Sequence, residues 1–173
     1  MEAQTQTGKK HNFILQQGFE GAQAQSCPLQ YSALQFQPRI VGVAVLLGVL
    51  FQSPAIFLIL SAVLWWNTLV PRHNPFDAVY NRTLGSRPGA VELAPAPPPR
   101  RFAQGMAASF NLAVGLFLLL GWTKAAYVVE GLLLAAVAAL VFGGFCLGSF
   151  VYHLIRGRKD FAMHTLPWSR TAA

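Results

Sequence analysis

The sequence contains few charged residues and few cysteines. Only 11% of its 173 residues are Asp, Glu, Lys or Arg, whereas 54% are hydrophobic, and an ordinary soluble domain has about 25% charged residues. Much of the surface is therefore not expected to face water. The two cysteines, Cys27 and Cys146, are too few for a disulfide framework, and neither has the ligand spacing of a zinc site. The first 26 residues lack the apolar core of a cleavable signal peptide.

The charge that is present is mostly positive. The chain has 13 Lys and Arg against 6 Asp and Glu, a formal net charge of +7. A basic chain can bind nucleic acid, but the high apolar content instead favours a lipid bilayer with its anionic surface. We expect the bilayer to be a partner and nucleic acid not to be one.

Two long apolar regions dominate the chain, and each divides into two. Residues 40–51 and 54–70 are separated by Gln52 and Ser53, and Pro54 is suited to the first turn of a new helix. The second region breaks at Thr123 and Lys124. A helix needs about 20 residues to cross a bilayer. The sequence predicts an all-α, polytopic membrane protein with four transmembrane helices in two helical hairpins, at about 34–52, 54–70, 103–122 and 125–147.

Three polar segments flank these predicted spans. They are an amino-terminal arm (1–33), a connection (71–101) whose clustered prolines favour an extended polyproline spacer, and a basic tail (156–173). The arm carries an apolar patch that could lie on a membrane surface or against a partner, formed by Phe13, Ile14, Leu15 and Phe19. The predicted fourth span continues into apolar residues that are expected to leave the hydrocarbon near Cys146 or to bend at Gly143–Gly144.

The basic residues indicate the orientation. Of the 13 Lys and Arg, Lys124 alone falls between the spans of a hairpin; the other 12 fall on the opposite side, 11 of them in the arm, the connection and the tail and Arg39 near the start of the first predicted span. Lys and Arg accumulate in cytoplasmic segments. We therefore expect a multi-pass protein of the cytoplasmic (inner) membrane with both termini in the cytoplasm.

Small residues recur every four positions in the predicted fourth span. Gly131, Ala135, Ala139 and Gly143 form the stripe, and Gly148 continues a face of close approach. Such stripes let helix backbones pack closely in lipid. The stripe is expected either to pack within the monomer or to dock another membrane subunit.

Three of the polar side chains inside the predicted spans are candidates for a function or for contacts between helices. Glu130 is a candidate functional acid, because intramembrane carboxyl groups are costly; otherwise it lies near the interface or bonds to Asn111 or Tyr127. Asn111 and Asn67 are expected to form hydrogen bonds between helices.

Cysteine and histidine offer a second kind of chemistry. Cys146, Ser149 and His153 share one helical face by their spacing, and His153 is a possible axial ligand for haem or chlorophyll. No cofactor is otherwise expected. Both Cys27 and Cys146 fall toward the cytoplasmic side of the predicted topology, so they are a candidate thiol pair.

Four segments together resemble an uncharacterised family of bacterial integral membrane proteins, domain-of-unknown-function family 4395. They are SCPLQYSALQFQPRIVGVAVLLGVL, FQSPAIF, PRHNPF and GFCLGSFVY, and the resemblance covers about residues 26–156. It implies the four-span arrangement and a Cys-Pro before the first span, matched by Cys27-Pro28. The family's ending commonly has two cysteines; Cys146 matches the first, and Ser149 stands in place of the second. The resemblance implies no activity.

These observations favour a non-catalytic accessory or structural subunit that packs in a larger energy-transducing or transport complex of the membrane. The sequence contains no catalytic constellation, and its long polar arms have nothing evident to pack on. One alternative is a thiol-redox or sulfur-handling membrane protein that uses Cys27 and Cys146. A weaker one is a small transporter built around Glu130.

Overall fold

The computed structural model describes residues 2–19, 27–87 and 89–169, with the backbone alone for 2–7 and 27. Every regular element within these residues is a helix. In chain order they are α1 (Glu2–Gln16), α2 (Cys27–Leu34), α3 (Phe36–Phe51), α4 (Pro54–Leu69), the 3-10 turn η1 (Pro71–His73), α5 (Pro75–Thr83), α6 (Pro98–Leu119), α7 (Thr123–Val141), α8 (Leu147–Ile155) and α9 (Lys159–His164).

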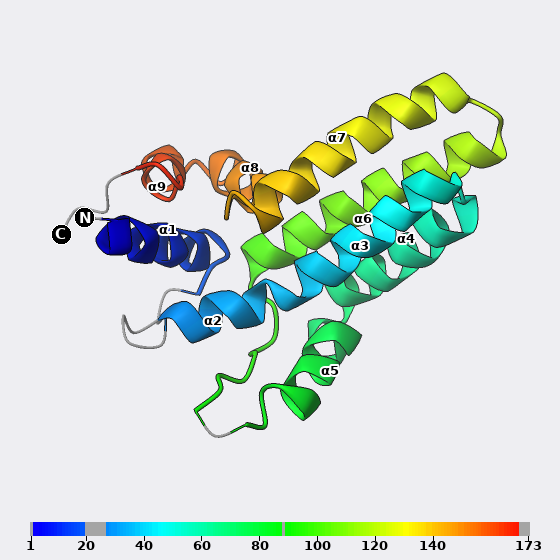
Figure 1. Cartoon of the computed structure of the whole chain (residues 1–173). Coiled ribbons are helices and arrows are strands. Elements are labelled where there is room, and N and C mark those ends of the chain that lie inside the picture. The colour runs from blue at the N-terminus through cyan, green and yellow to red at the C-terminus, as the bar shows by residue number, and fades with distance from the viewer. Residues whose placement is uncertain (1, 20–26, 88, 170–173) are drawn as a thin grey trace.

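Helices α3, α4, α6 and α7 lie side by side in a bundle, with the α3–α4 and α6–α7 turns at the same end (Figure 1). Helix α4 packs most extensively against α6, and α7 contacts both α6 and α3. Their shared core is made of aliphatic residues and one phenylalanine, including Val45, Phe57, Leu64, Ala108 and Val114. Close van der Waals packing of this kind holds helices together in lipid, where the hydrophobic effect between helices is lost.

The predicted break between the first two spans is confirmed. Gln52 adopts a left-handed conformation with φ of 45°, and its N–H bonds back to the carbonyls of Gly48 and Val49. Pro54 then begins α4, where its missing N–H does no harm. The second predicted turn is displaced. Residues 120–122 make it, with Gly121 at φ of 74°, and Thr123 and Lys124 already belong to α7.

Within the part of the chain that the structure describes, three helices are long and apolar enough to cross a membrane: Pro28–Phe51, Pro98–Leu119 and Thr123–Val141. Helix α4 is apolar but has only 16 residues. The first long helix is α2 continued by α3, so it begins before the predicted residue 34. Helix α6 begins before the predicted residue 103, because Pro98 and Pro99 form its first turn instead of an extended spacer.

The connection 71–101 is more ordered than the expected spacer. Asn74 accepts a hydrogen bond from the Phe76 N–H and Pro75 follows it, a capped start that produces helix α5. The part without helix or turn is residues 90–97. The predicted fourth span 125–147 is also too long: α7 ends at Val141, Gly144 turns the chain with φ of 62°, and α8 follows.

The expectation that the polar arms have nothing to pack on is wrong. Phe13 and Ile14 of α1 are fully buried in a cluster with Ala33 and Leu34 of α2. The Asn12 side chain donates to the Leu166 carbonyl at 3.0 Å, so α1 contacts the tail, which itself contains α9. The apolar patch of the arm is therefore covered by its own chain, and α1 lies close to α9 and the residues that follow it (Figure 1).

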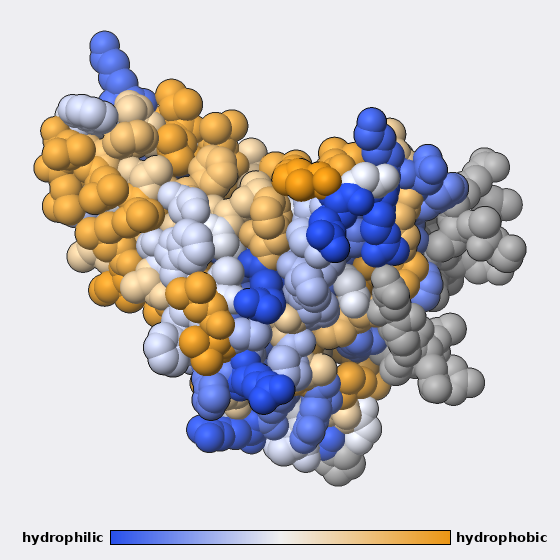
Figure 2. Space-filling model, turned by 180° about the vertical axis from the view of Figure 1, so that it is seen from behind, coloured by the Kyte–Doolittle hydropathy of each residue, from blue (hydrophilic) through white to orange (hydrophobic). Residues whose placement is uncertain are grey.

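The surface is divided in the same way as the charges. Figure 2 shows hydrophobic residues over the end of the bundle that carries the two turns, and hydrophilic residues over the opposite end and around α5. Exposed apolar side chains on the bundle include Val43, Leu50, Ile59, Leu119, Val128 and Leu132. Such a continuous exposed apolar surface is typical of helices that face lipid.

Candidate functional site

A buried network of polar side chains joins α3, α5 and α6 where the bundle meets its polar end. Arg100 and Asp77 form an ion pair, with 2.9 Å between Nη2 and Oδ1, and both side chains are almost fully buried. The Asn74 amide donates to the other Asp77 oxygen at 2.9 Å. Burial of a charge is tolerated only when the charge is paired and hydrogen-bonded, and this pairing meets that condition.

Gln37, in the first turn of α3, is the centre of the network. Its Oε1 accepts from Arg100 Nη2 at 3.1 Å, from Gln104 Nε2 at 3.0 Å and from Asn74 Nδ2 at 3.3 Å. Arg100 and Gln104 are four residues apart on α6 and so lie on one face. One amide oxygen thus serves three donors from two other segments.

Two polar atoms of this network have no hydrogen-bond partner within the part of the chain that the structure describes. They are the donor Arg100 Nη1 and the acceptor Gln104 Oε1, and both are buried. Unsatisfied buried polar atoms are rare and costly in folded proteins. They belong to residues one turn apart on α6, and the network is therefore the candidate functional site.

A cavity of about 230 Å³ lies between α3, α6 and α7, and Arg100 and Gln104 are among the residues that line it. Arg100 and Gln104 line its polar end. The rest of the wall is mainly aliphatic and aromatic, with Val41, Leu64, Phe110, Leu133, Ala136, Val137, Leu140 and Cys146 among its residues. Apolar walls with a few convergent polar groups are typical of small-molecule sites.

Cys146 forms part of this wall. Its backbone N–H donates to the Gln16 side-chain oxygen at 2.9 Å, which ties the turn before α8 to the end of α1. Burial raises the pKa of its thiol above the ordinary value, so the thiol is not activated as a nucleophile. The other half of the predicted thiol pair, the Cys27 side chain, lies outside the described residues.

His153 and Ser149 lie on the buried face of α8, as their spacing predicted. The His153 ring nitrogen Nε2 is 3.1 Å from the Gln16 carbonyl oxygen, and the ring packs 4.7 Å from that of Phe161. Ser149 donates to the Pro99 carbonyl at 3.3 Å and so joins α8 to the start of α6. Haem or chlorophyll ligation by His153 stays a prediction.

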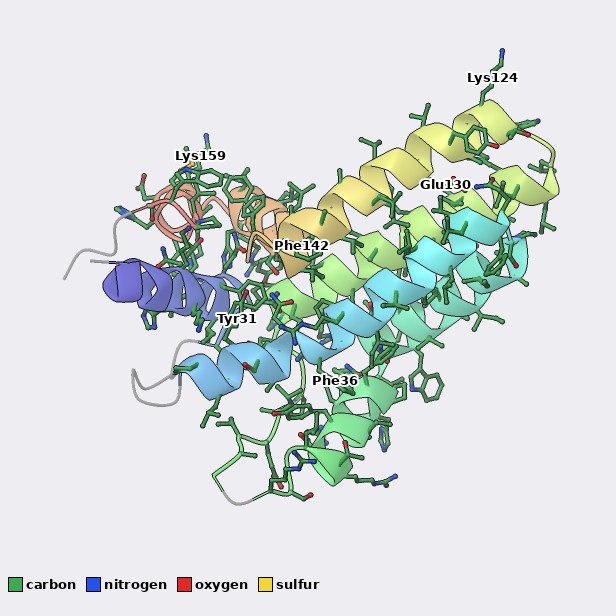
Figure 3. All side chains as sticks on the ribbon, in the orientation of Figure 1. Tyr31, Phe36, Lys124, Glu130, Phe142 and Lys159 are labelled. Carbon is green, nitrogen blue, oxygen red and sulfur yellow. The ribbon has the colours of Figure 1, made fainter. Side chains whose placement is uncertain are left out.

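Glu130 lies at the other end of the bundle, near the α6–α7 turn, and Lys124 points away from the bundle beyond it (Figure 3). The Glu130 carboxyl is buried and accepts from Gln52 Nε2, with distances of 3.3 and 3.1 Å to its two oxygens. Its partner is thus neither Asn111 nor Tyr127, because the α3–α4 turn brings Gln52 closer. Glu130 and the Arg100 network form separate sites.

Among the residues that the structure describes, the two predicted interhelical asparagines form no hydrogen bond to another helix. Asn111 donates to the Ala107 carbonyl of its own helix, the i−4 pattern that short polar side chains adopt in helices. Asn67 is fully buried, and neither side-chain atom has a partner among the described residues. The structure offers no physical account of the Asn67 burial.

The small-residue stripe does not pack within the monomer along its whole length. Gly131 and Ala135 are exposed, and a Cβ at Gly131 would meet no atom within 4 Å. Ala139 is half-buried and Gly143 is exposed after the end of α7. Gly148 alone makes the expected close approach, because a Cβ there would lie 2.6 Å from Ala103 Cα.

The residues of the network were not predicted from the sequence: Asn74, Asp77 and Arg100 fall in the connection 71–101, and Gln37 and Gln104 fall near the starts of the predicted spans 34–52 and 103–122. Two signals were available: the Asn74-Pro75 pair that starts α5, and the four-residue spacing of Arg100 and Gln104. Neither indicates that Gln37, 63 residues before Arg100, would be their partner.

A family model described as "Domain of unknown function (DUF4395)" matches residues 31–157. No curated protein and no solved structure matches the chain. The matched residues include every helix of the bundle, the polar network and all of the cavity lining except Gln17, and they exclude α1 and α9.

Proposed function

The chain belongs to the DUF4395 family of unknown function, and from its helices we propose that it is a four-span protein of the bacterial inner membrane. In this proposal both termini are cytoplasmic. The protein is a non-catalytic accessory subunit that packs beside larger subunits of an energy-transducing or transport complex.

The contact between the two ends of the chain supports an even number of crossings. Asn12 of α1 bonds to the Leu166 carbonyl after α9, so the segments before the first span and after the last lie on one side. Three long apolar helices are an odd number. The short apolar helix α4 is therefore proposed as the fourth crossing.

The distribution of basic residues supports the orientation. Among the Lys and Arg that the structure describes, Lys124 alone lies at the end of the bundle that carries the turns. Reporter domains fused to the amino terminus, to the carboxyl terminus and into the α6–α7 turn would test this arrangement. We expect cytoplasmic signals from both termini and an external signal from the turn; any other combination rejects the orientation.

The outer face of α7 is the observation that carries the subunit role. Helix α7 is the least buried of the three long helices, and its Gly131 and Ala135 face outward. Lipid tails pack against large apolar side chains as well as another helix does. Small residues on one face, in contrast, specifically permit the close approach of another helix.

The test is the native mass of the protein after gentle extraction from its own membrane, with everything that travels with it identified. Co-purification in fixed ratio with a larger complex is expected. Gly131→Leu and Ala135→Leu should each release the protein from that complex, whereas Ala138→Leu, at an exposed position outside the stripe, should not. Migration alone or as a small homo-oligomer rejects the subunit role.

Thiol-redox chemistry is the competing function. It requires both cysteines, and the burial of Cys146 disfavours it in this conformation. The double variant Cys27→Ser, Cys146→Ser separates the two functions: the subunit role predicts little loss, and the redox role predicts complete loss.

A further inference from the structure

We propose that α8 lies in the plane of the membrane at its cytoplasmic surface, and that Arg156 and Lys159 after it bind the headgroups of anionic phospholipids. The inference rests on the proposed membrane location and orientation, and it is independent of the subunit role. Three features carry it: the direction of α8, the chemistry of its exposed face, and the cations that follow it.

The chain changes direction between α7 and α8. Gly144 turns it with φ of 62°, and Figure 1 shows α8 nearly end-on while α6 and α7 are seen from the side, so α8 runs across the bundle. A Cβ at Gly148 would lie 2.6 Å from Ala103 Cα, and Ser149 donates to the Pro99 carbonyl at 3.3 Å. These contacts hold α8 against the first turns of α6, at the polar end of the bundle.

The two sides of α8 differ in their exposure. Gly148, Ser149 and His153 are buried against the rest of the protein. Leu147 and Ile155 are 43% and 70% exposed, and their spacing of eight residues places them on one face of the helix. A short helix with an apolar face turned outward is typical of a helix that lies in the membrane interface.

This apolar face continues the lipid-facing surface of the bundle. Leu147 lines the same cavity as Leu132 of α7, and both side chains are exposed. Phe142, at the end of α7, is 87% exposed. Acyl chains that cover α7 can therefore also cover the outer face of α8, which places the residues after Ile155 at the level of the headgroups.

The residues at that level are mostly cationic. Arg156, Arg158 and Lys159 are exposed, and Asp160 is the one acid among residues 156–160. The Arg158 guanidinium lies 4.3 Å over the Phe161 ring, whereas Arg156 and Lys159 form no ion pair with any residue that the structure describes. Figure 3 shows Lys159 pointing away from the molecule. Basic side chains beside an apolar membrane-facing surface attract anionic phospholipids.

The test identifies the lipid that contacts the end of α8. The full chain carries Ile155→Trp, with its four native tryptophans changed to phenylalanine, and is reconstituted in phosphatidylcholine bilayers. Quenching of its fluorescence is measured against the mole fraction of brominated phosphatidylglycerol or of brominated phosphatidylcholine. A second protein that retains Trp122 alone reports whether the turn end of the bundle is embedded.

The reporter at position 155 is expected to be half-quenched by phosphatidylglycerol at a mole fraction roughly fivefold lower than by phosphatidylcholine. The preference should be lost in about 1 M salt, which screens charges beyond about 3 Å. Arg156→Gln together with Lys159→Gln should also remove it. Arg82→Gln together with Arg87→Gln removes two exposed cations in α5 and after it; this matched control should retain the preference.

Three results overturn the inference alone, provided that Trp122 is quenched. Equal quenching by the two lipids shows that α8 does not recognise an anionic headgroup. Equal loss of the preference in the control pair shows that it follows net charge and not the residues after α8. No quenching at position 155 places α8 outside the bilayer. If neither reporter is quenched, the membrane location fails and the inference with it. The subunit role is tested by co-purification and can fail separately.

Discussion

Gln52 Nε2 lies 3.1 and 3.3 Å from the two carboxyl oxygens of Glu130, and the same nitrogen donates to the Val49 carbonyl at 2.8 Å. One amide therefore closes the α3–α4 turn and joins it to α7. This relationship gives the buried acid a structural role in holding the α3–α4 turn against α7.

Substitution of Glu130 should separate that structural role from proton transport. Glu130→Gln keeps an acceptor for Gln52 and is expected to alter the free energy of unfolding by less than about 1 kcal/mol, whereas Glu130→Ala should cost about 1–3 kcal/mol. Denaturant titration in detergent micelles measures both. Equal losses would show that the hydrogen bond does not stabilise the fold, and complete loss of a transport activity in stable Glu130→Gln protein would favour the transporter alternative.

The Asp77–Arg100 ion pair should show strong coupling. Asp77→Ala leaves the buried guanidinium without its carboxylate partner and is expected to cost about 3–5 kcal/mol in unfolding free energy. The double variant Asp77→Ala, Arg100→Leu removes both charges and should recover part of this loss. A double-mutant cycle from thermal or chemical unfolding measures the coupling; strictly additive single losses would contradict it.

Gly148 and Gly131 should respond differently to the same change. Gly148→Ala pushes α8 from the Ala103 backbone and is expected to destabilise the protein by about 1–3 kcal/mol, the range for overpacking. Gly131→Ala enters open space and should be neutral or stabilising by up to about 1 kcal/mol through helix propensity. Unfolding of the two purified variants is the measurement. An unchanged stability for Gly148→Ala would place α8 farther from α6 than described.

The buried Cys146 thiol should make stability depend on pH. Because burial raises the pKa of this thiol, the unfolded chain loses its proton first as the pH rises. Stability contributed by the neutral thiol is present below the ordinary thiol pKa, about 8.5, and falls above it.

The free energy of unfolding of the Cys27→Ser protein, measured between pH 7 and 10, tests this sign. The stability is expected to begin to fall at about pH 8.5. The further variant Cys146→Ala is the control and should lack that part of the decline. Identical pH profiles for the two proteins would mean that the Cys146 thiol ionises as readily in the folded protein as in the unfolded chain.

The sequence was sufficient for the features that local chemistry determines. The break at Gln52–Ser53 and Pro54 was predictable because proline is compatible with only the first turn of a helix, and the helical class followed from the length of the apolar runs. Residues 142–146 separate α7 from α8, and the Gly143–Gly144 pair had indicated a bend there.

The features that depend on distant partners were not predictable. The arm packs on its own chain because α2 covers Phe13 and Ile14, and no local pattern in residues 1–33 indicates which surface lies opposite. The Arg100 network was not predictable for the same reason, because its partner Gln37 lies in another predicted span. The pairing of Glu130 with Gln52 depends on the register between two hairpins, which periodicity within one helix does not contain.

The short length of α4 has a consequence for the membrane around the protein. Its 16 residues rise about 24 Å at about 1.5 Å per residue, less than the hydrocarbon thickness of about 30 Å. As a crossing helix it would produce hydrophobic mismatch on one flank of the bundle. Lipid beside α4 would be thinned while lipid beside α6 would not, and the protein should partition toward thinner bilayers.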